Sequence, residues 1–192
     1  KPNIDGVNFV EQPMQTILEQ RAPAAVPTLL GFNHDEMWAL LSSLPSWLRG
    51  LEVDVALSIL FGVETGLKAW SHYKHLASGH DKTAAVVKIL TDYLFTCAGQ
   101  ASALALPHPS YVYQYNHADS FGREIFSRFG LPQCAIDGRV CHMAEIPLVF
   151  NNTGPADLNA TLSRAELGLS AQIMRAFTTF AKGGSPGWQP FE

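Results

Sequence analysis

Apolar positions in the first half of the chain predict one short strand followed by a series of helices. Residues 26–32 form a short apolar run bounded by proline and asparagine, which predicts a buried strand. A helix is expected to open at residues 33–36 and to continue through the apolar positions that follow. Apolar residues then recur at helical spacing over residues 52–77, with a break near Gly62, and again over residues 82–104.

The second half of the chain returns to a strand and ends in a helix. Residues 111–115 are rich in aromatic and β-branched side chains, which is typical of a strand. A loop of about 25 residues should follow, a length that is unusual in a compact domain unless the loop is functional. Residues 163–166 form a capping box, which predicts a helix running to about Lys182. Two strands separated by a long helical stretch favour a helix-rich α/β fold that contains the late part of a sheet.

Composition places the chain among folded globular proteins. Of its 192 residues, 47% are hydrophobic and 16% are charged, which excludes intrinsic disorder. The net charge is −4 and no basic run occurs, so nucleic acid is not expected as a partner. Glu52 and Asp54 interrupt the longest apolar stretch, so no membrane span is expected. Because no internal repeat or low-complexity linker occurs, residues 1–192 are expected to belong to one domain.

The start of the chain, its cysteines and its sequons bear on processing and location. The sequence begins without methionine and without a charged and apolar leader, so we expect a processed chain or a piece of a longer one. Cys134 and Cys141 flank a turn-prone hexapeptide, and they either form a disulfide or remain two reduced thiols. Sequons begin at Asn151 and Asn159, and they are glycosylated only along a eukaryotic secretory route.

Two side chains stand at positions that suit catalysis in an α/β fold. Glu36 follows the first predicted strand closely, and functional groups of open α/β sheets gather at the carboxyl ends of strands. A carboxylate there can orient an imidazole and stabilise its protonated form. The alternative for Glu36 is a capping pair in which Asn33 is the helix N-cap. His142 ends the long loop and could act as a general base, although any of the 7 histidines can instead be structural.

Other kinds of site find less support in the sequence. His72, His75 and His80 resemble metal ligands, and an independent helical domain with a metal there is one alternative. The closely spaced Cys and His pairs of a zinc site are absent, so we expect a solvated helix end and no metal. No phosphate-cradling loop occurs, and no cofactor is expected. No G-x-S-x-G elbow occurs either, because the sequence from Gly168 to Gln172 fails at its last position.

Several segments together resemble the C-terminal part of type-B carboxylesterases, the cholinesterase-like branch of the α/β-hydrolases. The segments that carry the resemblance are 30–36 (LGFNHDE), 90–95 (LTDYLF), 112–115 (VYQY), 141–150 (CHMAEIPLVF), 162–166 (LSRAE) and 177–186 (FTTFAKGGSP). Their order and spacing across nearly the whole chain make the combination specific. The resemblance implies an α/β-hydrolase fold, of which residues 1–192 would be the C-terminal portion of a single domain.

The resemblance also implies roles for Glu36 and His142. Glu36 falls on the acid of the family's Ser-Glu-His triad and His142 on its general base, in the chain order that α/β-hydrolases use. Asp92, Glu145 and Glu166 match the family's pattern as well, and we interpret these three as structural. The nucleophile elbow and the oxyanion loop belong to the family's N-terminal portion, which this chain lacks. We therefore expect the chain to be inactive alone.

The expected function is a share in a serine carboxylic-ester hydrolase. Its partners would be a small-molecule ester and the N-terminal portion that carries the serine, with no cofactor or metal. The alternative is a non-catalytic, cholinesterase-like adhesion or binding module, since fold does not fix function. Export is the family's habit, so a secreted or periplasmic location is expected, with a cytoplasmic one as the alternative.

Overall fold

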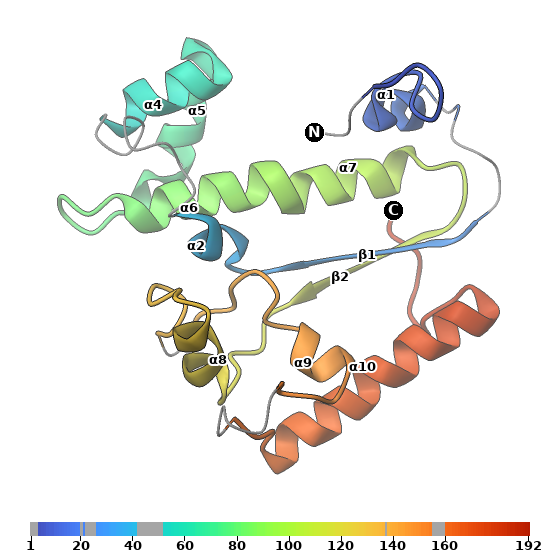
Figure 1. Cartoon of the computed structure of the whole chain (residues 1–192). Coiled ribbons are helices and arrows are strands. Elements are labelled where there is room, and N and C mark those ends of the chain that lie inside the picture. Colours follow the sequence, from blue (N-terminus) through green and yellow to red (C-terminus); the bar gives the residue numbers. More distant parts are fainter. Residues whose placement is uncertain (1–3, 20, 22–25, 42–51, 137, 155–159) are drawn as a thin grey trace.

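Two parallel strands lie between two layers of helices in the computed structural model of this chain (Figure 1). The structure describes residues 4–19, 21, 26–41, 52–136, 138–154 and 160–192. Strand β1 (Thr28–Asn33) pairs with β2 (Ser110–Tyr115) in register, from Thr28 opposite Ser110 to Asn33 opposite Tyr115. Both strands lie close to the expected ranges. The first four residues of β1 are partly buried or exposed, and only its last two are buried. The expected burial of this strand therefore holds for its carboxyl end alone.

The connection between the strands is a helical crossover, as parallel pairing requires. Its elements are α2 (Glu36–Leu40), α4 (Val53–Phe61), α5 (Val63–Tyr73), the 3-10 turn η2 (Lys74–Leu76), α6 (Thr83–Thr91), η3 (Asp92–Thr96) and α7 (Cys97–Ala105). Gly62 separates α4 from α5 at a φ of 83°, which confirms the expected break. The helix expected over residues 82–104 is present as a continuous rod of α6, η3 and α7, which covers one face of the sheet (Figure 1).

The second layer of helices comes from the C-terminal half. It contains α8 (Gly122–Arg128), α9 (Ile146–Val149) and α10 (Arg164–Gly183), and α10 covers the face of the sheet opposite α7 (Figure 1). The expectation of an unstructured loop after β2 is wrong over α8. Helix α8 and its N-cap residue bury three apolar side chains at helical spacing, Phe121, Ile125 and Phe126. The burial of these side chains stabilises a helix despite the flanking glycine and proline, which suggest a loop.

Helix α10 begins where its capping box predicts. The Ser163 hydroxyl accepts a hydrogen bond from the Glu166 N–H at 3.3 Å, and the Ser163 N–H donates to Glu166 Oε2 at 2.7 Å. The helix ends at Gly184, whose φ of 74° is the left-handed conformation that glycine adopts readily. A further helix, α1 (Pro13–Leu18), lies near the end of α7 (Figure 1).

The main core forms on the α10 side of the sheet. Its buried members are Ala39, Tyr115, Phe121, Ile125, Phe126, Cys134, Val140, Cys141, Ala144 and Leu148. A second, smaller cluster joins Met37 of α2 to Val87 and Leu90 of α6. The core therefore ties the end of β2 to the segment that carries His142, while the smaller cluster ties α2 to the rod. Over the described ranges, no helix is both long and apolar enough for a membrane crossing.

Gly31 of β1 lies directly against the ring of an aromatic residue of β2. Its register partner is Tyr113, whose ring lies over the glycine so closely that a Cβ there would stand 1.9 Å from Tyr113 Cζ. The ring of Tyr113 is in turn 5.7 Å from that of Phe177 on α10, centroid to centroid. The missing side chain at Gly31 thus makes room for the aromatic contact that joins the sheet to α10.

We predict that Gly31→Ala lowers the free energy of unfolding by about 1–3 kcal/mol, because the methyl group must displace the Tyr113 ring from this packed site. Denaturant unfolding measures the change. The matched control is Gly168→Ala on α10, where nothing lies within 4 Å of the added Cβ. That control should leave stability unchanged or raise it by up to about 1 kcal/mol, since alanine is the better helix former. Equal effects of the two substitutions would contradict the close approach at Gly31.

Candidate active site

The candidate site lies where both strands end. The His34 N–H donates to the Tyr115 carbonyl at 3.1 Å, which continues the pairing one step beyond the strands. The chain then turns, and Glu36 is the first residue of α2. The N-cap of α2 is Asp35, so the alternative in which Asn33 is the N-cap of this helix is wrong. This turn brings Glu36 back under the end of the sheet, where only 3% of its surface is exposed.

The two oxygens of the Glu36 carboxylate have different partners. Oε1 accepts a hydrogen bond from the Asn33 N–H at 2.6 Å. Oε2 lies 2.5 Å from Nδ1 of His142. A buried carboxylate is costly unless donors satisfy it, and here a backbone amide and an imidazole do so. The structure therefore brings together Glu36 and His142, the two site residues expected from the sequence.

The His142 ring is held through Nδ1, and its side chain is partly exposed. Its side chain is 40% exposed, and within the described ranges Nε2 makes no hydrogen bond. The ring of Phe95, in the π-helical turn η3, lies 5.6 Å from the His142 ring between centroids. The hydrogen bond with Glu36 raises the pKa of His142, and partial burial opposes this only in part. The site thus combines an oriented imidazole with a free ring nitrogen.

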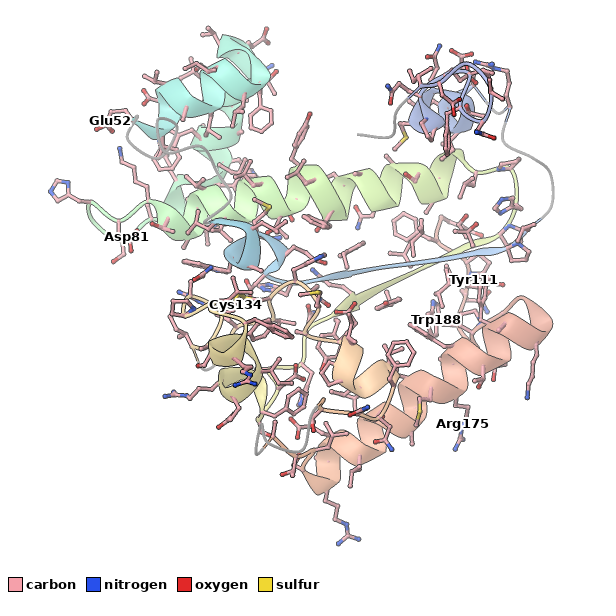
Figure 2. All side chains as sticks on the ribbon, in the orientation of Figure 1. Glu52, Asp81, Tyr111, Cys134, Arg175 and Trp188 are labelled. Atoms are coloured by element: carbon pink, nitrogen blue, oxygen red, sulfur yellow. A yellow bond between two sulfur atoms is a disulfide. The ribbon has the colours of Figure 1, made fainter. Side chains whose placement is uncertain are left out.

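Three contacts hold the segment that leads to His142. Cys134 and Cys141 form a disulfide, which decides between the two alternatives left open by the sequence (Figure 2). Asp35 binds the backbone of Val140 twice: its N–H donates to the Val140 carbonyl, and its Oδ2 accepts from the Val140 N–H, both at 3.0 Å. The Arg139 guanidinium lies 3.5 Å above the ring of Trp38 in α2. The segment is therefore fastened to the turn that carries Glu36.

The other acidic residues of interest occupy structural positions. Asp92 accepts a hydrogen bond from Tyr73 at 2.7 Å and one from Lys88 at 2.5 Å, within the helical layer. Burial by itself would raise the pKa of Glu166, but hydrogen bonds from Ser120 and Ser163 lower it to about 2. Glu166 is therefore an ionised cap that anchors the start of α10.

Metal binding finds little support in the geometry. His72, His75 and His80 are exposed, and the Nδ1–H of His75 donates to the His72 carbonyl at 2.8 Å instead of facing a shared ion. Within the described residues, the ligand atoms of His117, Asp119 and Glu166 do lie within 4.8 Å of one another. The Glu166 oxygens already accept hydrogen bonds from Ser120 and Ser163, however, so they have little capacity left for a cation.

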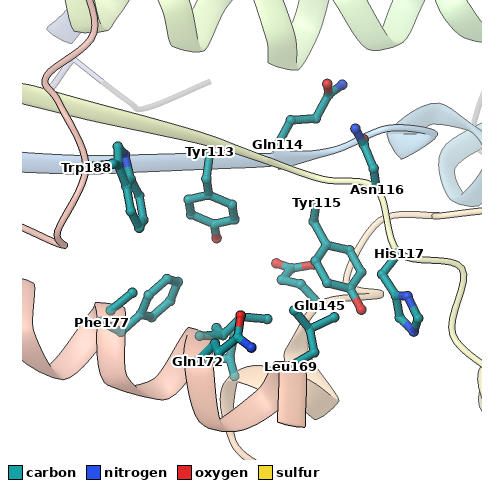
Figure 3. A pocket seen from close by; sticks show the side chains of 13 residues that line it. Tyr113, Gln114, Tyr115, Asn116, His117, Glu145, Leu169, Gln172, Phe177 and Trp188 are labelled. Atoms are coloured by element: carbon teal, nitrogen blue, oxygen red, sulfur yellow. The ribbon is translucent and has the colours of Figure 1, made fainter. Parts of the chain in front are cut away.

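A cavity of about 320 Å³ lies between β2 and α10. Figure 3 shows Tyr113 facing it from β2, and Gln172 and Phe177 facing it from α10, while Glu145, just before α9, also lines it. Burial, and then the nearby carboxylates of Glu145 and Glu36, raise the pKa of Tyr113 to about 12. Neither Glu36 nor His142 lines the cavity, but Glu145, three residues after His142, does, so the cavity borders the candidate site without containing its acid or base.

The sequence analysis missed two residues of this site. The side-chain amide of Asn33 donates to the Cys141 carbonyl at 3.0 Å and to Glu145 Oε2 at 2.5 Å. Phe95 contacts the His142 ring from a helix that is far away in sequence. The position of Asn33 at the end of a strand is a signal for the former, but its N-cap propensity pointed elsewhere. The position of Phe95 depends on the π-helical turn, for which the sequence carries no comparable signal.

Comparison with known proteins identifies the family of this chain. A model of the carboxylesterase family matches residues 1–191. This chain belongs to the carboxylesterase family. Among its relatives, the "Crystal protein" of Dictyostelium discoideum is 33% identical and aligns with 96% of this chain and 33% of its own length. Carboxylesterase 5A of Felis catus is 29% identical, over 96% of this chain and 35% of its own length. This carboxylesterase-family chain therefore spans about a third of the length of these relatives.

The solved structures show the fold of this family member. A PNB esterase structure superposes with a TM-score of 0.70 at 24% identity, covering 98% of this chain and 36% of the esterase. The fold expected from the sequence is thereby confirmed: the chain is part of an α/β-hydrolase, helix-rich with a small parallel sheet.

We predict that Glu36→Gln lowers the pKa of His142, because the carboxylate bond that raises this pKa is lost while partial burial remains. An NMR titration of the His142 ring protons measures the shift. Because the pKa of His142 is raised in the folded protein, the bond between Glu36 and protonated His142 stabilises the folded state fully at a pH below the ordinary histidine pKa of 6.5. This stabilisation is lost as the pH rises through the raised pKa of the folded protein. The stability lost in Glu36→Gln should therefore be greatest in acid. Glu64→Gln, which removes an exposed partner of Lys68, is the matched control and should leave the His142 titration unchanged.

We predict that replacing Cys134 and Cys141 together by serine lowers the free energy of unfolding by about 2–3 kcal/mol, the contribution expected for a short closed loop. Denaturant unfolding with and without a reductant measures it: the wild-type protein should respond to the reductant and the double variant should not. Cys97 is an exposed free cysteine, so Cys97→Ser should respond as the wild type does. A wild-type protein insensitive to the reductant would contradict the prediction.

Proposed function

We propose that this chain supplies the acid and the histidine base of a Ser-Glu-His triad in a serine carboxylic-ester hydrolase, and that the serine lies in an N-terminal portion of the same domain outside residues 1–192. The observation that carries the proposal is the 2.5 Å contact between Glu36 Oε2 and His142 Nδ1, on an imidazole whose side chain remains partly exposed. Membership of the carboxylesterase family supports the same reaction class.

The geometry suits a general base that works through Nε2. A serine hydroxyl that attacks an ester carbonyl would give its proton to Nε2 of His142 as the new C–O bond forms. Glu36 would hold the neutral ring with its proton on Nδ1 and would stabilise the imidazolium that results. Collapse of the tetrahedral intermediate would break the bond to the leaving alkoxide, which would take the proton from Nε2. Water would then release the acid from the serine by the same two proton transfers.

The free edge of the sheet supports the proposed N-terminal portion. Within the described ranges, β1 pairs only with β2, and a two-stranded parallel sheet is marginal by itself. A further strand on the open side of β1 would cover its unpaired backbone groups. It would also bring the carboxyl end of another strand to the same edge of the sheet as Glu36 and His142, where the nucleophile must lie.

The substrate and the location follow the same proposal. A small-molecule ester is the substrate class that this chemistry accepts, and no step in it calls for a metal or a cofactor. The disulfide between Cys134 and Cys141 favours an oxidising environment, which supports secretion. One of the two sequons starts at the exposed Asn151, while Asn159 lies outside the described residues.

We predict that the complete protein carrying this sequence hydrolyses a small aryl ester and is labelled on one serine by a fluorophosphonate, and that His142→Ala slows hydrolysis by at least about 10⁴-fold, because the base is lost. Ester hydrolysis, and intact-mass and peptide analysis after labelling, provide the readouts. His80→Ala, at an exposed histidine that has no role in the proposed reaction, is the control and should keep full activity.

Two results would overturn the proposal. A wild-type protein with neither labelling nor hydrolysis would favour the alternative, a binding module that keeps the fold without the reaction. Activity that survives His142→Ala would show that another group is the base.

A further inference from the structure

Asn33 is the most extensively connected buried polar residue next to the acid and base pair. Only 1% of its surface is exposed. Its backbone N–H donates to Glu36 Oε1 at 2.6 Å, and its side-chain nitrogen donates to the Cys141 carbonyl at 3.0 Å and to Glu145 Oε2 at 2.5 Å. One residue thus contacts the acid, the residue directly before His142 and a residue shortly after it.

The side chain of Asn33 acts here as a pair of donors. Each of its two N–H groups has an acceptor, whereas Oδ1 is buried without a hydrogen-bond partner in the described part of the chain. Burying an unpaired acceptor is unfavourable, and an apolar residue of similar size would avoid that cost. The arrangement is therefore explained by what the two N–H groups hold in place.

The two acceptors of this amide bracket a sharp bend of the backbone. Met143 has a φ of 71°, a conformation that is uncommon for residues other than glycine. The disulfide and the Asp35 contacts hold only the residues before His142, at Val140 and Cys141. The Asn33 amide reaches both sides of the bend, at Cys141 and at Glu145, so it restrains the orientation of the His142 ring between them.

We propose that Asn33 is a positioning residue for the reaction: its amide holds the segment from Cys141 to Glu145 against the end of β1, so that His142 Nδ1 faces Glu36. This inference rests on the proposed function, because it assigns a role in a reaction carried out by His142. Asn33 itself touches neither the substrate nor the reacting atoms. It acts through the distance and direction of the Glu36–His142 contact.

The test uses two substitutions of similar shape in the complete protein. Asn33→Leu keeps the volume and removes both donors, and Asn33→Asp replaces the donors by acceptors that face the Cys141 carbonyl and the Glu145 carboxylate. Each should lower kcat by about 10²-fold, the loss expected when a catalytic group is displaced by about 1 Å. KM should change by less than about 3-fold, since no substrate contact is removed. Rates are expressed per active site, titrated with the fluorophosphonate, so that misfolded protein does not count.

Two readouts separate positioning from a merely structural role. In Asn33→Leu the acidic limb of kcat/KM should move to lower pH, because a looser contact with Glu36 no longer raises the pKa of His142. Adding Glu145→Gln should recover about 10-fold of the Asn33→Asp loss, because the new amide can donate to the new carboxylate. The same second substitution should recover nothing in Asn33→Leu.

The control is Asn116→Asp, which places the same change just after the neighbouring strand, where the side chain is exposed and makes no hydrogen bond in the described part of the chain. Its kinetics should match the wild type. The inference is overturned if both Asn33 variants keep the wild-type kcat per active site. It is also overturned if kcat falls but Glu145→Gln gives no recovery and the acidic limb of kcat/KM does not move. Either result leaves the proposed function standing. If Asn33→Leu yields no folded protein, the rescue of Asn33→Asp decides alone. An inactive wild-type protein would instead refute the proposed function.

Discussion

The parallel register of β1 with β2 is the constraint on which the candidate site depends. It sets Asn33 opposite Tyr115, so that the turn to Glu36 and the segment toward His142 leave the sheet at the same edge. Strand side chains alternate between faces, and a slip of one residue would turn Asn33 and Tyr113 to the wrong sides. Gly31 suits this register, because a Cβ at that position would collide with the Tyr113 ring.

The carboxylate of Glu36 divides its two oxygens between local and distant partners. The bond from the Asn33 N–H is set by the turn itself, whereas the bond to His142 joins parts of the chain that meet only in the folded protein. Because the hydrogen bond from the backbone orients the whole carboxylate, the direction of its second oxygen is fixed as well. The imidazole therefore meets an acceptor whose position is already determined by the backbone.

The periodic elements of this fold could be predicted from the sequence, and contacts between distant side chains could not. The two strands, the break at Gly62 and the capping box at Ser163 have local signals, and they stand close to where those signals put them. Glu36 and His142 were candidates by their positions after a strand and at the end of a loop, and their roles came from a family resemblance that spans most of the chain. Helix α8 was missed because glycine and proline flank a short segment, in which too few apolar residues occur for a helical spacing to stand out.

The amide of Asn33 illustrates the limit of local signals. An asparagine before a helix usually caps it, and this expectation is based on the residue's own neighbourhood. Here the turn made Asp35 the N-cap, which freed the asparagine side chain for acceptors more than a hundred positions away. No pattern in the sequence predicts a hydrogen bond between residues that are so far apart along the chain.

The sequence distance between the acid and the base also has a consequence for the order in which the molecule folds. Glu36 and His142 are 106 positions apart, whereas the two cysteines of the disulfide are separated by only 7. Closing a long loop costs more chain entropy than closing a short one, and it is favourable only after the helices between have packed. On chain entropy alone, we therefore expect the cysteine-bounded turn to close before the acid and the base meet.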